Sequence, residues 1–282
     1  MTKVQVIVDS AAALPREVVE RAALQVVPLR LNIGERSYAD GDLPLEEVVA
    51  RLDDGVKTSA PSPGEWSAAF ERALAGADRA VVLTVSAAMS STYGAARLAA
   101  SDFGSRVEVI DTGTAAGAEG LVALAAAQVA GNGGNPPSVI HAASRVVDQV
   151  KLVATMDSLD QLVRGGRVPS LAGWAGRRLG VNPLFEFAHG QVHPLRPAFS
   201  QAAALDRLVH AVSSSAPDRR AVLRVAALHA VAPHLAGELV ARLRATTSRL
   251  DAYVASFSPV MVAHTGAGLV GLAWWWDDAL VV

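Results

Sequence analysis

The first half of the chain alternates short hydrophobic runs with stretches whose hydrophobic residues recur at helical spacing. The strand-like runs are VQVIVDS, AVVLTVS and VEVID, and the helical stretches after them are LPREVVERAA, STYGAARLAAS and GTAAGAEGLVALAAAQVA. Apolar strands that each lead into a helix usually pair in parallel, and their helices cover both faces of the sheet. The pattern predicts an α/β domain.

The second half has a different pattern. LFEFAHGQVHPL alternates around His189 and Gly190 like a β-hairpin, and LDAYVASF, PVMVAH and LVGLAWWW follow as strands joined by short turns. QAAALDRLVHAVSS and APHLAGELVARLRATT have helical spacing and should cover this sheet. The cluster GNGGNPPS, residues 131–138, marks a boundary. We therefore expect a parallel-sheet α/β domain over residues 1–137 and a mixed, partly antiparallel α/β domain over residues 138–282.

One uncharged stretch is long enough to span a bilayer. It is SPVMVAHTGAGLVGLAWWW, 19 residues from Ser258 to Trp276. Pro259, His264 and three glycines divide it into short runs, so we interpret it as two buried strands joined by a glycine turn. The opening MTKVQVIVDS has an apolar run too short for a signal peptide, and we expect a cytoplasmic protein.

Composition limits the classes of partner and chemistry. Hydrophobic residues make up 51% of the chain, charged residues 18%, and the formal net charge is −2. Such a balance offers no strong field for nucleic acid or an anionic membrane, and we expect at most transient membrane contact. The chain has no cysteine, which excludes disulfides, thiolate metal sites and cysteine nucleophiles.

Metal and nucleotide motifs are equally weak. His229 and His234 are separated by Pro233, which breaks the helix face that a histidine pair would need. Gly266, Gly268 and Gly271 spell G-x-G-x-x-G, but too few residues follow for a crossover helix and a second strand. We expect neither a metal nor a cofactor.

The stretch TSAPSPGEW, residues 58–66, combines a helix start with further hydroxyl groups. Ser62 and Glu65 form a capping box with Pro63 at the first helical position, which predicts a helix over residues 63–74. Thr58 lies on the preceding loop, where its hydroxyl is as able to face a ligand as to close a turn.

A second loop, in SAAMSSTYGAA, also leads into a helix N-terminus, where free N–H groups attract an anion. Thr58, Ser90, Thr92 and the N–H of Ser91 then form a neutral donor set, accompanied by one histidine, His264. Without a lysine in this set, a carboxylate is a better ligand than a polyphosphate.

A serine hydrolase or acyltransferase is the alternative from another class. Ser90 and His264 could converge with Asp9 in space, although no G-x-S-x-G motif occurs. Side chains at strand ends, such as Asp9, Ser10 and Asp111, more commonly cap the following helix.

Seven segments in register resemble the DegV family of bacterial fatty-acid-binding proteins. They are VIVDSAAALP, TSAPSPGEW, SSTY, VIDTGTAAGAEGL, RGGRV, NPLFEFAHGQV and AHTGAGLVGLAW, and they cover nearly the whole chain. The resemblance implies two α/β domains that enclose one long-chain fatty acid, with its carboxyl group at the opening and its tail buried. It also implies that the protein is no enzyme by itself, but the lipid-carrying subunit that presents the acid to an ATP-dependent fatty-acid kinase.

The resemblance assigns individual residues to the ligand. Thr58 and Ser90 match residues that hydrogen-bond the carboxylate, His264 matches the histidine of the H-T-G-x-G turn, and Arg167 matches an arginine of the ligand mouth. Ser91 stands where the family usually has glycine, whose freedom at positive φ is then lost.

The chain also departs from the family after GQVHP. Phe199 and Ser200 stand where an arginine and a threonine are expected. If that basic cluster helps to bind the kinase or to hold the acyl phosphate, this protein has another partner or no kinase. The further alternative is a kinase-independent, lipid-responsive regulator.

Overall fold

A computed structural model describes residues 2–156, 160–164, 181–217 and 221–278. Within these ranges the helices are α1 (Arg16–Arg21), α2 (Leu45–Ala50), α3 (Pro63–Leu74), α4 (Thr92–Ala100), α5 (Ala116–Gly131), α6 (Pro136–Val147), α7 (Asp160–Arg164), α8 (Gln201–Ser213), α9 (Pro233–Thr246) and α10 (Pro259–Thr265). The strands are β1 (Val4–Asp9), β2 (Gln25–Val27), β3 (Arg30–Ile33), β4 (Arg36–Ala39), β5 (Lys57–Ser59), β6 (Arg79–Thr84), β7 (Val107–Asp111), β8 (Lys151–Thr155), β9 (Asn182–Ala188), β10 (Gln191–Ala198), β11 (Val222–His229), β12 (Leu250–Ser256) and β13 (Val270–Asp277).

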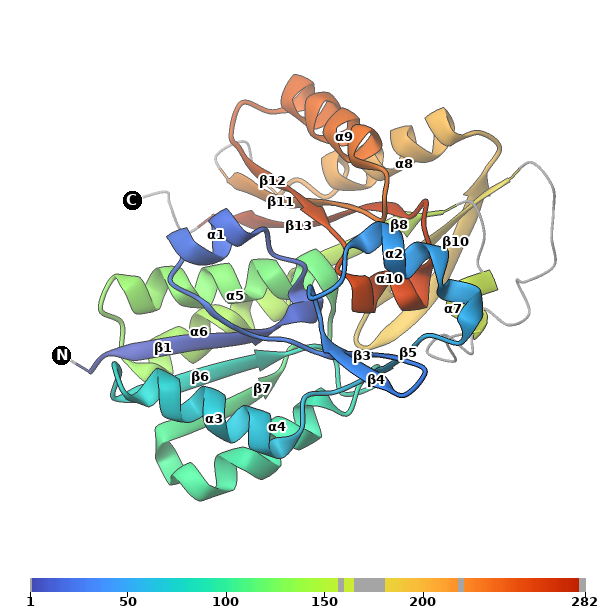
Figure 1. The fold of residues 1–282 in the computed structure, drawn as a ribbon. Helices are drawn as coiled ribbons and strands as arrows, with labels where there is room; N and C mark the ends of the chain where they lie inside the picture. Colours follow the sequence, from blue (N-terminus) through green and yellow to red (C-terminus); the bar gives the residue numbers. More distant parts are fainter. Residues whose placement is uncertain (1, 157–159, 165–180, 218–220, 279–282) are drawn as a thin grey trace.

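The amino-terminal half is built on a parallel sheet with strand order β2–β1–β6–β7. Helices α3 and α4 cover one face, where Trp66 and Phe70 pack with Ile7 in one buried cluster. Helices α5 and α6 cover the other face (Figure 1). The predicted α/β architecture is confirmed.

Helix α3 begins where the sequence predicts. Ser62 is the N-cap, its hydroxyl accepts the N–H of Glu65 at 3.3 Å, and a carboxylate oxygen of Glu65 accepts the N–H of Ser62 at 2.7 Å. Pro63 occupies the first helical position. Both features of the capping box are therefore present.

A small antiparallel sheet, β4–β3–β5, was not predicted. Thr58 is the middle residue of β5 and pairs with Leu31 of β3. The expectation of a loop at Thr58 was wrong, because Lys57–Ser59 pair with β3 at the edge of this sheet. The consequence is that backbone pairing fixes the position of the Thr58 side chain.

The carboxy-terminal half contains a mixed sheet with strand order β10–β9–β8–β13–β11–β12. Strands β11 and β12 pair in parallel, and the other neighbours are antiparallel. The turn of the β9–β10 hairpin lies at His189 and Gly190, which have φ angles of 50° and 73°. Helices α8 and α9 cover one face. The predicted hairpin, mixed sheet and covering helices are confirmed.

The uncharged segment from Ser258 to Trp276 differs from our expectation in its first part. Residues Pro259–Thr265 form helix α10 instead of a strand, and the second part forms β13. The hydroxyl of Ser258 caps the helix, and Gly266, with a φ of 71°, ends it. In the described part of the chain, no helix is long and apolar enough to cross a membrane.

Helix α5 lies between the two large sheets, so that helices and sheets stack in five layers (Figure 1). It contacts β1 and β6 of the parallel sheet and β8, β11 and β13 of the mixed sheet. A methyl group on Gly117 would come within 2.5 Å of the Ala226 side chain, so the mixed sheet reaches the helix backbone here. The predicted domain boundary between residues 137 and 138 falls in the first turn of α6.

Candidate functional site

Thr58 and His264 meet at the junction of the two halves. The hydroxyl of Thr58, on β5, lies 2.7 Å from Nε2 of His264, in the last turn of α10. The two residues are 206 positions apart in the sequence, and both are partly buried. A hydroxyl and an imidazole that share a hydrogen bond at a partly buried junction can together hold one carboxylate oxygen.

Ser90, Ser91 and Thr92 lie together at the start of α4. The hydroxyls of Ser90 and Thr92 are 2.7 Å apart, and the N–H of Thr92 donates to the Ser90 hydroxyl at 3.3 Å. Ser91 is the N-cap residue, with a φ of −73°, so a non-glycine residue is unstrained at this position. The backbone at Ser91 therefore does not need the positive φ that a glycine would allow.

The loop that carries Ser90 is held by carboxylates at the ends of two strands. Asp9 accepts the N–H of Val85 at 2.8 Å, and Asp111 accepts the N–H of Ala87 at 3.1 Å. Asp9 also accepts the N–H of Ala11 at 2.9 Å, which caps the short turn after β1. Asp9 therefore has the capping role expected of a strand-end side chain, whereas Asp111 holds the loop after β6 and does not cap α5, whose N-cap is Ala115.

The turn of the β9–β10 hairpin, in the carboxy-terminal half, contacts the loop that carries Ser90. The N–H of Gly190 donates to the carbonyl of Gly113 at 2.7 Å. A Cβ on Gly190 would lie 2.6 Å from Oγ of Ser86 and 2.8 Å from Cβ of Ala88. The hairpin turn is thus in direct contact with the segment that leads to Ser90.

The contacts do not pair the residues of a serine hydrolase. Nε2 of His264 is hydrogen-bonded to Thr58, and the Ser90 hydroxyl to that of Thr92. Asp9 is fully buried and accepts two backbone N–H groups. Each member of the hypothetical triad is therefore engaged with another group.

Glu119 was missed by the sequence analysis. It lies in the first turn of α5, fully buried beside Asp9, and neither carboxyl oxygen has a hydrogen-bond partner among the described residues. Burial raises its pKa well above the usual value, and the neighbouring charges of Asp9 and Asp111 add to this. Burial likewise raises the pKa of Asp9 to about 7, although its backbone hydrogen bonds lower it. Glu119 therefore keeps its proton to a higher pH than a solvent-exposed glutamate does.

Asp40 was also missed. Its carboxylate accepts the N–H of Val260 in α10 at 3.0 Å and the hydroxyl of Ser10 at 2.7 Å. Burial raises its pKa, and these hydrogen bonds oppose the rise. The local sequence Ala-Asp-Gly is typical of a turn and gives no signal of a contact 220 residues away.

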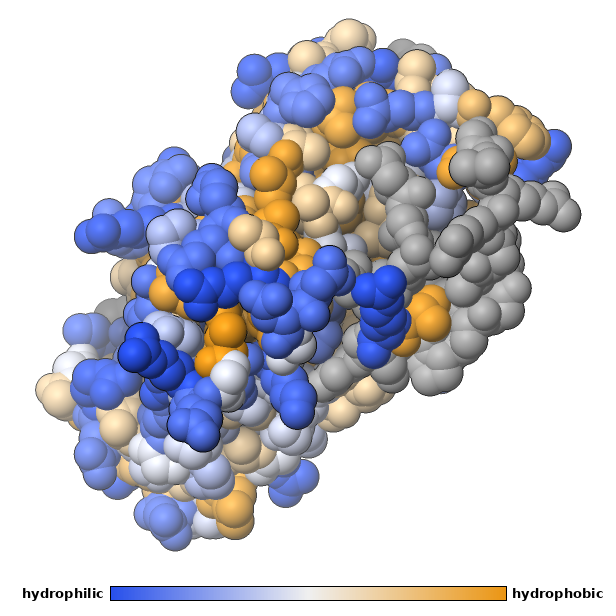
Figure 2. All heavy atoms as spheres, turned by 45° about the vertical axis from the view of Figure 1, so that its right-hand side comes forward, coloured by the Kyte–Doolittle hydropathy of each residue, from blue (hydrophilic) through white to orange (hydrophobic). Residues whose placement is uncertain are grey.

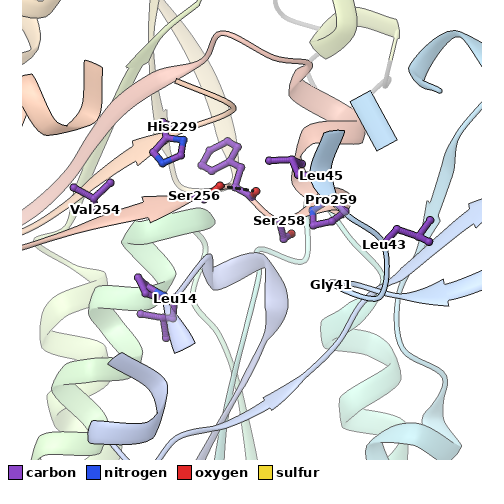
Figure 3. A pocket seen from close by; sticks show the side chains of 11 residues that line it. Leu14, Gly41, Leu43, Leu45, His229, Val254, Ser256, Ser258 and Pro259 are labelled. Carbon is purple, nitrogen blue, oxygen red and sulfur yellow. Dashed lines mark hydrogen bonds between the residues drawn. The ribbon is translucent and has the colours of Figure 1, made fainter. Parts of the chain in front are cut away.

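Hydrophobic side chains gather in a band between the two halves on the face shown in Figure 2. A groove of about 430 Å³ lies at this junction, beside the start of α10 (Figure 3). Its lining residues are Leu14, Pro15, Gly41, Leu43, Leu45, His229, Val254, Ser256, Phe257, Ser258 and Pro259. His229 is buried, which lowers its pKa, so its imidazole is neutral at pH 7.

The remaining sequence predictions have different outcomes. Arg167 lies outside the described residues. Ser200 is the N-cap of α8 and accepts the N–H of Ala203 at 3.1 Å, whereas the neighbouring Phe199 is 76% exposed. Among the described residues, no group of three or more His, Cys, Asp or Glu side chains is placed to hold a metal ion.

Known proteins resemble this chain over nearly its whole length. A DegV domain-containing protein of Streptomyces coelicolor is 34% identical over 274 residues, which cover 95% of this chain and 97% of the relative. A DegV domain-containing protein of Mycobacterium tuberculosis is 32% identical over 272 residues, with coverages of 95% and 96%.

Solved structures agree with this similarity. A fatty-acid-binding DegV family protein from Thermus thermophilus superimposes with a TM-score of 0.90 at 26% identity, over 97% of this chain and 99% of that chain. DegV of Bacillus subtilis, a fatty acid binding protein, superimposes with a TM-score of 0.87 at 25% identity, over 98% and 100%. The family described as "Uncharacterised protein, DegV family" matches residues 3–276. The family match covers nearly all of this chain, and the S. coelicolor relative is 34% identical over 95% of it. The chain therefore belongs to the DegV family.

Proposed function

We propose that this protein binds one long-chain fatty acid at the junction of its two halves. Its carboxyl group would be held at the opening by Thr58, Ser90, the N–H of Ser91 and His264, and its tail would be buried. Two observations support the proposal. The chain is similar over its whole length to fatty-acid-binding proteins from T. thermophilus and B. subtilis, and Thr58 meets His264 across the junction. The second observation carries the assignment of the site.

The apolar tail supplies most of the binding free energy in this proposal. A sixteen-carbon tail contributes on the order of 12 kcal/mol, at about 0.8 kcal/mol for each buried methylene. Association and ordering cost several kcal/mol of this, which leaves an affinity in the micromolar to nanomolar range. The hydroxyl and N–H donors then fix the orientation of the carboxylate, because they return little more than its lost hydration.

Presentation of the bound acid to an ATP-dependent fatty-acid kinase is the second part of the proposal, in which the protein itself is a carrier. The exposed Phe199 lies where the family has a basic residue, so the alternative of a kinase-independent, lipid-responsive regulator is retained. Loaded protein mixed with ATP and a fatty-acid kinase should yield acyl phosphate. A protein that holds its lipid and yields none supports the regulator.

The assignment of Thr58 is tested with Thr58→Val, which keeps the shape of the side chain and removes the hydroxyl. Removing the hydroxyl leaves a carboxylate oxygen without a donor after it has lost its hydration, which costs about 1–3 kcal/mol, so the Kd for palmitate or oleate should rise about tenfold. Delipidated protein would be titrated with a fluorescent fatty acid, and the natural acids would compete.

The matched control is Ser59→Ala, which removes an exposed hydroxyl from the next residue of β5. Equal Kd values for the two folded variants would remove Thr58 from the site. A wild-type protein that neither carries a fatty acid after purification nor takes one up would refute the proposed function as a whole.

A further inference from the structure

Helix α10 belongs to the carboxy-terminal half by sequence, but both of its ends are held by the amino-terminal half. At its last turn, His264 contacts the Thr58 hydroxyl of β5 at 2.7 Å. At its first turn, the N–H of Val260 donates to the Asp40 carboxylate at 3.0 Å. Between these points the helix packs against α2, β3 and β5, and it lies beside α2 in Figure 1.

Asp40 is itself firmly placed. Its second carboxylate oxygen accepts the hydroxyl of Ser10 at 2.7 Å. The same hydroxyl oxygen accepts the N–H of Leu29 at 3.0 Å. Hydrogen bonds therefore run from the end of β1 and the segment before β3, through Asp40, to the backbone of α10.

Two hollows border the first turn of α10, although Pro259 and Val260 are themselves buried. The groove of Figure 3 is lined by Ser258 and Pro259, next to Gly41. A smaller cavity of about 150 Å³ is lined by Asp40, Ser10 and Ser258, among others. The hydrogen bond from Val260 to Asp40 therefore acts together with the buried side chains of Pro259 and Val260 to hold this end of the helix.

We propose that Asp40 is a positioning residue for the ligand site, which sets the place of His264 through helix α10. A helix of seven residues is too short to bend between its ends, so a movement at Val260 is transmitted to His264. The inference rests on the proposed fatty-acid site and deepens it. Asp40 need not touch the ligand to affect its affinity.

The test compares Asp40→Ala with Asp40→Asn. The alanine removes both hydrogen bonds, whereas the asparagine keeps an acceptor oxygen for the N–H of Val260. Imidazole ¹H and ¹⁵N resonances of His264 would be recorded on lipid-free protein, with His264→Gln to assign them, and Kd values for palmitate would be measured in parallel. Asp42→Asn is the matched control, because Asp42 is exposed and accepts the N–H of Ala39 in the same turn.

We expect Asp40→Ala to shift the His264 resonances and to raise the Kd about fivefold or more, and Asp40→Asn and Asp42→Asn to change neither. Unshifted His264 resonances in a folded Asp40→Ala would overturn the inference, as would shifted resonances with an unchanged Kd. If Asp40→Ala does not fold, Ser10→Ala removes one of the two hydrogen bonds and should give smaller changes in the same direction. A wild type that binds no fatty acid refutes the proposed function, while the resonances still report on the positioning.

Discussion

Replacement of Gly190 by alanine tests the contact between the two halves most directly. Gly190 has a φ of 73°, where an alanine costs about 1–2 kcal/mol. The added methyl group would also lie 2.6 Å from Oγ of Ser86 and 2.8 Å from Cβ of Ala88. Ser86 is buried and Ala88 has no side-chain torsion to turn, so the hairpin must move away.

The movement adds to the conformational cost. Overpacking of this kind costs about 1–3 kcal/mol. Loss of the hydrogen bond from the N–H of Gly190 to the carbonyl of Gly113 would cost about 1 kcal/mol in addition. With that hydrogen bond broken, the free energy of unfolding of Gly190→Ala should therefore fall by about 3–6 kcal/mol. The control is Gly34→Ala, in the β3–β4 turn, where φ is 60° and a Cβ meets nothing within 4 Å. It should lose only about 1–2 kcal/mol.

Urea denaturation followed by circular dichroism gives both free energies, and the difference between the variants should be about 2–4 kcal/mol. Under the proposed function, Gly190→Ala should also release fatty acid faster, because its turn displaces the loop that carries Ser90. A folded Gly190→Ala that is no less stable than Gly34→Ala would refute the packing argument. Unchanged lipid release with the stability loss present would separate the hairpin contact from the ligand site.

Two further predictions concern stability. Because the pKa of Asp9 is raised from 3.8 to about 7, the folded state holds a proton that the unfolded state has lost. The contribution of Asp9 to stability is therefore fully present below about pH 4 and falls by about 1.4 kcal/mol per pH unit up to pH 7. The pKa of Glu119 is raised in the same direction, so its contribution is also lost as the pH rises. Glu119→Gln should flatten this slope in urea titrations between pH 5 and 8, and the exposed control Glu108→Gln should not; equal slopes would contradict the burial argument. Ser62→Ala should lower the free energy of unfolding by about 1 kcal/mol through loss of the cap, whereas Ser67→Ala in the same helix should not, and an unchanged urea midpoint for Ser62→Ala would count against the capping role.

The elements with a strong local signal could be predicted from the sequence. Three parallel strands, the β9–β10 hairpin and the helix after Ser62 each follow from periodicity or from turn and cap residues nearby. Helix α10 has the same signal, a serine N-cap followed by proline at Ser258 and Pro259, and Gly266 at its end. The β-branched residues of PVMVAH favoured a strand, but a capped start and the packing on α2 decided otherwise.

Contacts between distant segments could not be predicted in this way. The residues around Thr58 have no pattern that predicts strand β5. This strand forms through its pairing with β3, in which Thr58 lies opposite Leu31. Glu119 has the position of an ordinary helix N-terminal carboxylate, and only the packing of α5 on the parallel sheet, beside Asp9 at the end of β1, turns that position into a buried one. Thr58 and His264 could be named as candidate ligand residues from the sequence. Their contact at 2.7 Å could not, because it depends on the packing of α10 against β5.

Helix α5 has a consequence for how the molecule opens and unfolds. Since its buried side chains belong to a core shared by both halves, pulling the halves apart would expose apolar surface on two sheets at once. The halves should therefore melt in a single transition, and amide protons of α5 should exchange at the rate of global unfolding. A ligand would then enter through local opening of peripheral segments, while α5 and its contacts with both sheets stay in place.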